Sequence, residues 1–202
     1  MKPFLFPVKT LLPVILACRA GAALAEEHKR EPGPFKVQTF TELVLRDKQR
    51  QKDLPLRISH PDGKGPFPII VWSHGMFGSK DGYQPLVEHW VSHGYVVIQP
   101  THSDSLSLVS KEEVQQTIAK LKAGQKAGRT DDWMSRPRDV QFALDSLDGI
   151  AKQVPGLAER MDRQRIGVGG HSFGALTTQL VAGTSARPPG GKRQSFADPR
   201  PV

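Results

Sequence analysis

Hydrophobic residues in this chain gather in short, nearly continuous runs, and other segments carry apolar residues at helical spacing. Short apolar runs bounded by proline, glycine or charged residues are typical of strands that are covered on one or both faces. They predict strands over residues 40–47, 54–60, 68–73, 95–100 and 165–169. Apolar residues three and four positions apart favour helices over residues 85–93, 111–123, 138–154 and 175–182.

The order of these elements predicts an α/β fold. Only a short charged turn separates the first two strands, so we expect them to form an antiparallel hairpin. The later strands alternate with helices, which favours a mostly parallel sheet. Residues 101–133 form a longer polar connection around one predicted helix, which either borders a substrate pocket or only joins two elements in solvent.

The N-terminal segment differs in character from the rest of the chain. Residues 1–25 combine an early lysine, a short apolar stretch and small residues before Ala25, which is the pattern of a secretory signal peptide. Residues 26–34 then form a polar linker and residues 35–202 the folded domain. We therefore expect a secreted or periplasmic protein cleaved after Ala25. A lipoprotein signal ending at Cys18 and a buried N-terminal helix are the alternatives.

Composition and charge exclude several classes of function. The chain has 202 residues, 38% of them hydrophobic and 24% charged, as in an ordinary globular domain, and no later apolar run is long enough to span a membrane. Loss of residues 1–25 would lower the formal charge from +8 to +5, because that segment holds Lys2, Lys9, Arg19 and no acidic residue. The remaining basic residues are mixed with acidic ones and lack interleaved aromatics, so we expect no nucleic-acid partner. The composition leaves the oligomeric state open.

Cysteine and histidine spacing argues against thiol and metal chemistry. Cys18 is the only cysteine and would leave with the signal peptide, so the exported domain would hold neither a disulfide nor a thiol nucleophile. No pair of histidines or cysteines has the spacing of zinc ligands. We therefore expect no metal site.

The segment Gly170-His171-Ser172-Phe173-Gly174 has the G-x-S-x-G pattern of a nucleophile elbow, between a predicted strand and a predicted helix. Such a turn exposes a serine hydroxyl in a strained conformation, and Gly170 and Gly174 leave room for the helix to pack against the strand. The sequence therefore predicts Ser172 as a catalytic nucleophile. The alternative is a purely structural glycine-rich turn.

A second motif, Ser73-His74-Gly75-Met76-Phe77-Gly78, directly follows a predicted buried strand. In acyl transfer the tetrahedral intermediate carries an oxyanion, which preorganised backbone N–H groups stabilise. We expect the N–H groups of Met76 and Phe173 to form this oxyanion hole. We expect Gly75 and His74 to support the loop, His74 through hydrogen bonds and not as a catalytic base.

The histidine that would activate Ser172 is absent from its expected place. In elbows of this kind the acid and then the histidine follow the serine along the chain, yet all seven histidines lie before Ser172. His102, after a predicted strand, is the one candidate for a substitute base, because a base must come within hydrogen-bonding distance of the serine hydroxyl. Asp198 is the only acidic residue after Ser172, and its Asp-Pro-Arg context indicates a turn.

These motifs together resemble the α/β-hydrolase superfamily, and within it the branch that is similar to platelet-activating-factor acetylhydrolase and dienelactone hydrolase. The resemblance begins near residue 35 and is carried by four segments, at residues 72–76, 94–97, 132–140 and 169–175. It implies that Met76 and Phe173 supply the oxyanion donors. It also implies carboxylic-ester substrates, often with short acyl groups, and no cofactor. The serine at the nucleophile position favours the acetylhydrolase side, because dienelactone hydrolases use cysteine there.

The sequence thus predicts a serine carboxylic-ester hydrolase that works through an acyl-enzyme on Ser172. The resemblance also implies two or three further C-terminal strands and a catalytic histidine, and the sequence has neither. We therefore expect an N-terminal part of a longer esterase that is inactive by itself. The alternative is an exported, non-catalytic binding or scaffold protein with the same fold. A serine peptidase is a third possibility, since the elbow does not distinguish esters from amides.

Overall fold

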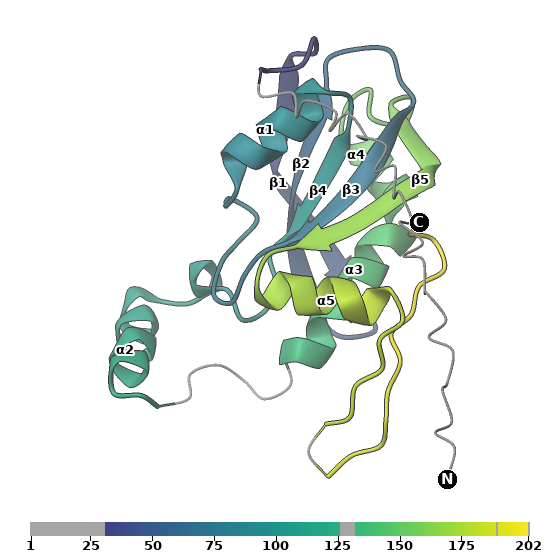
Figure 1. The fold of residues 1–202 in the computed structure, drawn as a ribbon. Coiled ribbons are helices and arrows are strands. Elements are labelled where there is room, and N and C mark those ends of the chain that lie inside the picture. Colours follow the sequence, from purple (N-terminus) through teal and green to yellow (C-terminus); the bar gives the residue numbers. More distant parts are fainter. Residues whose placement is uncertain (1–30, 126–131, 189, 202) are drawn as a thin grey trace, which may run out of the picture. The chain divides into compact units, whose positions relative to one another are not determined.

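The computed structural model describes residues 31–125, 132–188 and 190–201. The predicted signal peptide, with Cys18, and most of the predicted linker lie outside these residues. A five-stranded sheet forms the centre of the described part of the chain, with the strand order β1-β2-β4-β3-β5 (Figure 1). The strands are β1 (Val37–Asp47), β2 (Lys52–Pro61), β3 (Phe67–Ser73), β4 (Val96–Pro100) and β5 (Met161–Gly170).

The strand pairing confirms the predicted N-terminal hairpin and the mixed sheet. β1 pairs antiparallel with β2, and β2 pairs antiparallel with β4. β3 lies between β4 and β5 and pairs with both in parallel. Because parallel strands end on the same side of a sheet, the loops after β3, β4 and β5 meet at one edge, where ligands of open α/β sheets usually bind.

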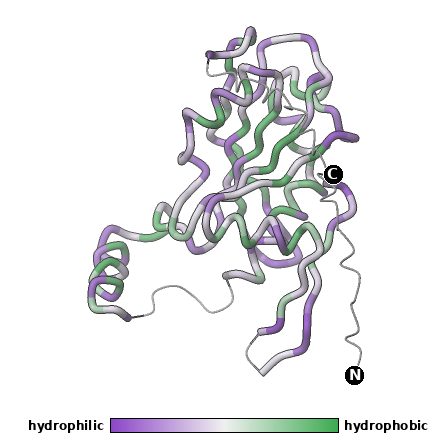
Figure 2. The backbone as a smooth tube through the Cα atoms, in the orientation of Figure 1, coloured by the Kyte–Doolittle hydropathy of each residue, from purple (hydrophilic) through white to green (hydrophobic). Residues whose placement is uncertain are grey.

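Alternating residues of the central strands face two hydrophobic layers, one on each side of the sheet. Ile69 and Val71 of β3 point into the larger core beneath helices α3 (Asp132–Asp145), α4 (Leu147–Gln153) and α5 (Phe173–Val181). Ile70 and Trp72 point toward α1 (Gln84–Ser92) on the other face. Figure 2 shows these central strands as hydrophobic along most of their length. Burial on both faces explains why their sequences are nearly continuous in apolar residues.

Two predicted boundaries are wrong. The helix predicted over residues 138–154 is two helices, α3 and α4, which part at Ser146, and α3 begins before Pro137. A proline in a helix removes one backbone hydrogen bond and normally marks a boundary, so the turn before Pro137 gave no helical signal. β5 begins at Met161 and not at 165, because its first residues pair with Phe67 and Pro68 although residues 163–165 are polar and exposed.

The remaining elements lie in the connection between β4 and α3 and beside β5. Between β4 and α3 lie a short 3-10 helix, η1 (Leu106–Leu108), and α2 (Lys111–Lys122). α2 begins with a capping box formed by Ser110 and Glu113, and none of its side chains is buried. The outer side of β5 carries an isolated parallel bridge between Ile166 and Pro201. No helix in the described ranges has both the length and the apolar character that crossing a bilayer requires.

Candidate functional site

Ser172 occupies the turn between β5 and α5. Its backbone has φ 53° and ψ −114°, a conformation that residues with a side chain rarely adopt, and its side chain is exposed. The Ser172 side chain makes no capping hydrogen bond to the helix that follows. Strained, exposed serines of this kind occur where the hydroxyl is presented to a ligand.

The two glycines of the motif allow this turn to pack closely. A Cβ atom on Gly170 would lie 2.4 Å from the carbonyl carbon of Gly174. A Cβ atom on Gly174 would lie 2.1 Å from the carbonyl oxygen of Ser73, which ends β3. Both distances are far below van der Waals contact, so any larger residue would separate α5 from β3 and β5.

The loop after β3 lies against the elbow. The His171 N–H donates to the carbonyl oxygen of Ser73 at 3.2 Å, which joins the two segments directly. The backbone N–H groups of Met76 and Phe173 have no hydrogen-bond acceptor among the described residues. Phe173 is the first residue of α5, so its N–H also lies at the positive end of that helix. The arrangement provides two free donors of the kind that stabilises an oxyanion.

His74 is buried and bonded at both ring nitrogens. Its Nδ1–H donates to the carbonyl oxygen of Gly75 at 2.6 Å, so its Nε2 carries the lone pair that accepts the His102 N–H at 3.0 Å. Burial lowers the pKa of His74 to about 3, and the neighbouring His102 adds to this effect. A neutral imidazole with both nitrogens engaged holds the loop and has no lone pair left for proton transfer.

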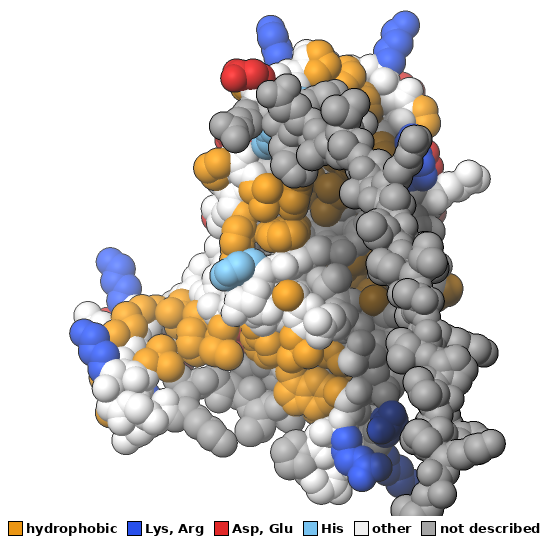
Figure 3. Space-filling model, viewed as in Figure 1, with side chains coloured by type: hydrophobic (Ala, Val, Ile, Leu, Met, Phe, Trp, Pro, Cys, Tyr) orange, Lys and Arg blue, Asp and Glu red, His pale blue; other side chains and the backbone are white. Residues whose placement is uncertain are grey.

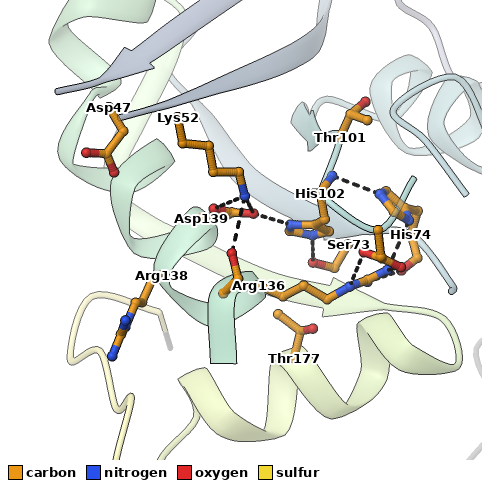
Figure 4. A network of polar contacts seen from close by, with 12 residues as sticks. Asp47, Lys52, Ser73, His74, Thr101, His102, Arg136, Arg138, Asp139 and Thr177 are labelled. Carbon is orange, nitrogen blue, oxygen red and sulfur yellow. Dashed lines mark hydrogen bonds and ion pairs between the residues drawn. The ribbon is translucent and has the colours of Figure 1, made fainter. Parts of the chain in front are cut away.

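Arg136 of α3 lies below the same loop and is fully buried (Figure 4). Its guanidinium donates to the carbonyl oxygens of His74 and Gly75, at 2.6 and 3.2 Å. It pairs with both carboxylate oxygens of Asp104, at 2.9 and 2.7 Å. Burial raises the pKa of Asp104, but hydrogen bonds and charge from Arg136 more than offset this, so the pKa is lowered. Asp104 in turn accepts the Phe77 N–H.

A second buried network has the connectivity of a catalytic triad without its accessibility. The Ser73 hydroxyl lies 2.8 Å from Nε2 of His102, and Nδ1 of His102 lies 2.9 Å from the carboxylate of Asp139 (Figure 4). All three residues are completely buried, so no substrate reaches this serine. Arg50 and Lys52 also pair with Asp139. The network joins β2, β3, β4 and α3 beneath the site.

The electrostatics of this network keep Asp139 ionised. Burial alone would raise the pKa of Asp139, but the hydrogen bond from His102 and the charge of Lys52 lower it to about 2. The pKa of His102 is lowered because burial outweighs the favourable effect of Asp139. Nδ1–H of His102 therefore donates to a carboxylate, and its Nε2 lone pair accepts the Ser73 hydroxyl.

The structure does not bring a base to Ser172 within the described residues. Both ring nitrogens of His102 are bonded, to Ser73 and Asp139, and not to Ser172. His171 is exposed, and its Nδ1 lies 2.9 Å from the hydroxyl of Tyr83. Asp198 pairs with Arg200 and accepts its backbone N–H, as expected of a turn. In the described ranges no three His, Cys, Asp or Glu side chains are arranged to hold a metal ion.

Sequence reasoning missed the supporting residues of this site, namely Tyr83, Asp104, Arg136 and Asp139. Arg136 and Asp139 lie in the segment 132–140 that carries the resemblance, but charged residues in a helix are usually solvated and gave no sign of burial. The signal that could have revealed Arg136 and Asp139 is the run of charged residues at 136–139, where a predicted core helix begins.

Hydrophobic side chains are exposed around the site. Figure 3 shows such side chains on the face that carries α5 and α2. The largest exposures include Met76 at 51% and Leu108 at 46%, with Ile118, Leu121 and Leu176 also exposed. A hollow of about 320 Å³ lies between Phe77, η1 and α2. Of these residues, Met76 lies in the loop after β3 and Leu176 lies in α5, the two elements that carry the site.

Comparison with known proteins places these features in a family. The family model described as Chlorophyllase matches residues 29–187. A presumed phospholipase A2 of Schizosaccharomyces pombe is 23% identical over 165 residues, which is 63% of this chain and 37% of that protein. Chlorophyllase-1 of Citrus sinensis, a chloroplast protein, is 41% identical over 46 residues, 23% of this chain and 14% of that protein.

A solved structure, the ferulic acid esterase of Streptomyces cinnamoneus, aligns with a TM-score of 0.47 and 19% identity, covering 75% of this chain and 56% of that one. The chain spans well under two thirds of the length of the curated relatives that it matches. The strand order and pairing confirm the predicted α/β fold class, with its N-terminal hairpin and its parallel strands. Since the family model covers most of its length, this chain belongs to the chlorophyllase family of the α/β-hydrolase superfamily.

Proposed function

We propose that this chain carries the nucleophile of a serine carboxylic-ester hydrolase, which cleaves small-molecule esters through an acyl-enzyme on Ser172. The observation that carries the proposal is the strained, exposed Ser172 at the start of α5, close to a loop with a free backbone N–H. Membership of the chlorophyllase family supports it, as does the phospholipase name of one relative.

The proposed reaction has two steps. Ser172 Oγ attacks the ester carbonyl carbon and loses its proton to a base, while the carbonyl oxygen becomes an oxyanion that accepts hydrogen bonds from Met76 and Phe173. The C–O bond to the alcohol then breaks, the alcohol takes up a proton, and an acyl-enzyme remains. Water attacks this ester in the same way and releases the acid.

The base is the one part of this mechanism that the described residues lack. We propose that a histidine, oriented by a carboxylate, comes from a segment of the longer protein outside these 202 residues. A serine hydroxyl without a base is a poor nucleophile, so these residues alone would have little activity. Oxyanion and binding effects by themselves still give residual catalysis of roughly 10³–10⁴ over water.

A fluorophosphonate probe tests the proposal. The probe is applied to the protein expressed from the complete reading frame and, separately, to a protein of these 202 residues. The labelled peptide is then identified by mass spectrometry. We expect labelling at Ser172 that is lost in S172A and kept in S73A, because Ser73 is buried. A folded, soluble full-length protein that stays unlabelled would favour the non-catalytic scaffold.

Substrate choice and export are further parts of the proposal. The exposed Met76 and Leu176, on the two elements that carry the site, favour esters with an apolar group. A series of p-nitrophenyl esters of increasing acyl length would measure this preference. We propose that residues 1–25 direct export and are removed after Ala25. The mass of the N-terminal peptide of the exported protein tests this, and a retained Met1 would contradict it.

A further inference from the structure

The loop after β3 presents two consecutive peptide groups whose orientation decides where the Met76 N–H points. In a planar trans peptide the C=O and N–H bonds point in opposite directions, so holding one fixes the other. The first group joins His74 to Gly75. Its carbonyl oxygen accepts from the Arg136 guanidinium at 2.6 Å, and its N–H donates to the Tyr83 hydroxyl at 3.2 Å. Arg136 and Tyr83 therefore hold this peptide group from opposite ends.

The second peptide group joins Gly75 to Met76. Its carbonyl oxygen accepts from His74 Nδ1 at 2.6 Å, from the Gly78 N–H at 3.1 Å and from Arg136 at 3.2 Å. With its carbonyl held in the buried network, the Met76 N–H must point the opposite way, away from Arg136. This orientation agrees with the lack of an acceptor for that N–H among the described residues.

The same two residues also contact the elbow, which carries the other donor. The guanidinium of Arg136 lies over the Phe173 ring, 4.3 Å from its centroid, a cation–π contact. The Tyr83 hydroxyl lies 2.9 Å from His171 Nδ1. Each residue thus connects the loop with one of the two neighbours of Ser172.

Backbone strain gathers at these positions. Four non-glycine residues of the described chain have positive φ, and three of them are Ser172, Phe77 and Tyr83. Bulky residues adopt this conformation at a cost, which the surrounding contacts must offset. The Tyr83 ring is held in place by an edge-on contact with Trp72 of β3.

We propose that Arg136 and Tyr83 are positioning residues that orient the Met76 N–H and hold it beside the Phe173 N–H as one oxyanion hole. This inference rests on the proposed function of Ser172. It assigns neither residue a contact with the substrate. Both act through the His74-Gly75-Met76 backbone.

Two variants test the proposal, each with a matched control. Y83F removes only the hydroxyl between Gly75 and His171, and Y95F makes the same change at the exposed Tyr95. R136K keeps the charge next to Asp104 but cannot reproduce the planar fork of donors, and R138K makes this change two residues along α3. Because a variant at the buried Arg136 can fail to fold, Y83F, at a half-buried site, keeps the test decisive.

The readouts are the rate of fluorophosphonate labelling at Ser172, kcat and KM for p-nitrophenyl acetate in the full-length protein, and the urea unfolding midpoint. Deleting an oxyanion donor costs about 10²–10³ in kcat, so misorienting one is expected to cost about 10-fold in Y83F and more in R136K. The loss should fall on kcat and on the labelling rate, with KM changed less than threefold. Both control variants should match the wild type.

The possible outcomes separate the two proposals. Absence of labelling in the wild-type protein overturns the proposed function of Ser172, and with it this inference. A labelled wild type together with a Y83F variant of unchanged kcat and labelling rate overturns the positioning role alone. Loss of activity in Y83F that is matched by a lowered unfolding midpoint also overturns it, because a structural role then explains the loss.

Discussion

Replacing Gly174 by alanine is expected to displace the elbow and reduce the reactivity of Ser172 more than it reduces stability. The added Cβ would lie 2.1 Å from the Ser73 carbonyl oxygen and 2.9 Å from that of His74. Real Cβ atoms essentially never come closer than 3.0 Å to such atoms, so α5 must move away from β3 by 0.9 Å or more. Both colliding atoms belong to the backbone, so no side-chain rotation relieves the contact.

The size of the effect follows from this displacement. Inserting a methyl group into close packing costs about 1–3 kcal/mol, and alanine recovers up to about 1 kcal/mol through its helix propensity. With that recovery in full, the net loss of unfolding free energy is expected to be at most about 2 kcal/mol. The Phe173 N–H moves with α5, and misplacement of a catalytic group by about 1 Å costs on the order of 10² in rate.

The assay compares G174A with G149A. No atom lies within 4 Å of a Cβ built on Gly149 of α4, so this control should gain up to about 1 kcal/mol from helix propensity alone. Urea unfolding followed by tryptophan fluorescence gives the stability, and fluorophosphonate labelling gives the reactivity of Ser172. If G174A unfolds and labels like G149A, the close approach of α5 to β3 has no role in the site, and the reasoning is refuted.

Two further predictions concern the buried networks. Because the pKa of His74 is lowered from 6.5 to about 3, the unfolded chain takes up a proton that the native state does not. Stability should therefore fall as pH decreases from 6.5 to 3, by on the order of 5 kcal/mol from this group. Urea midpoints measured across this range should show a flatter slope in H74N than in the wild type, and equal slopes would contradict the assignment. D139N should lose about 3–5 kcal/mol, because it leaves the charge of Lys52 without its buried partner and leaves Arg50 with Asp47 alone. D145N, which alters an exposed ion pair at the end of the same helix, should stay within about 0.5 kcal/mol of the wild type, and an equal loss in both variants would show that burial of Asp139 is unimportant.

The fold was predictable where local patterns coincide with tertiary burial. The runs at β3 and β4 are apolar because both faces of these strands are covered, so periodicity alone identified them. The elbow was predictable because the turn at Ser172 leaves no room for a Cβ atom at positions 170 and 174, and glycine is the residue that lacks one. α3 was placed too late because Pro137 lies inside the helix, where only tertiary packing offsets the lost backbone hydrogen bond.

The support of the site was not predictable because it depends on long-range pairing of charged residues. Arg136 pairs with Asp104, which is 32 positions away in the sequence, and Lys52 pairs with Asp139, which is 87 positions away. A charged residue in a single sequence is most simply interpreted as solvated, and only the fold shows which ones are buried and paired. The Tyr83 hydroxyl accepts from the backbone N–H of Gly75, a contact that no local sequence pattern indicates.

The most direct test of the central claim is to locate the residue that a fluorophosphonate probe modifies in the complete protein. The proposed function predicts one modified peptide that contains Ser172, with no signal in S172A and an unchanged signal in S73A. Modification of another serine, or equal labelling of S172A and the wild type, would contradict the claim that the turn before α5 presents the nucleophile.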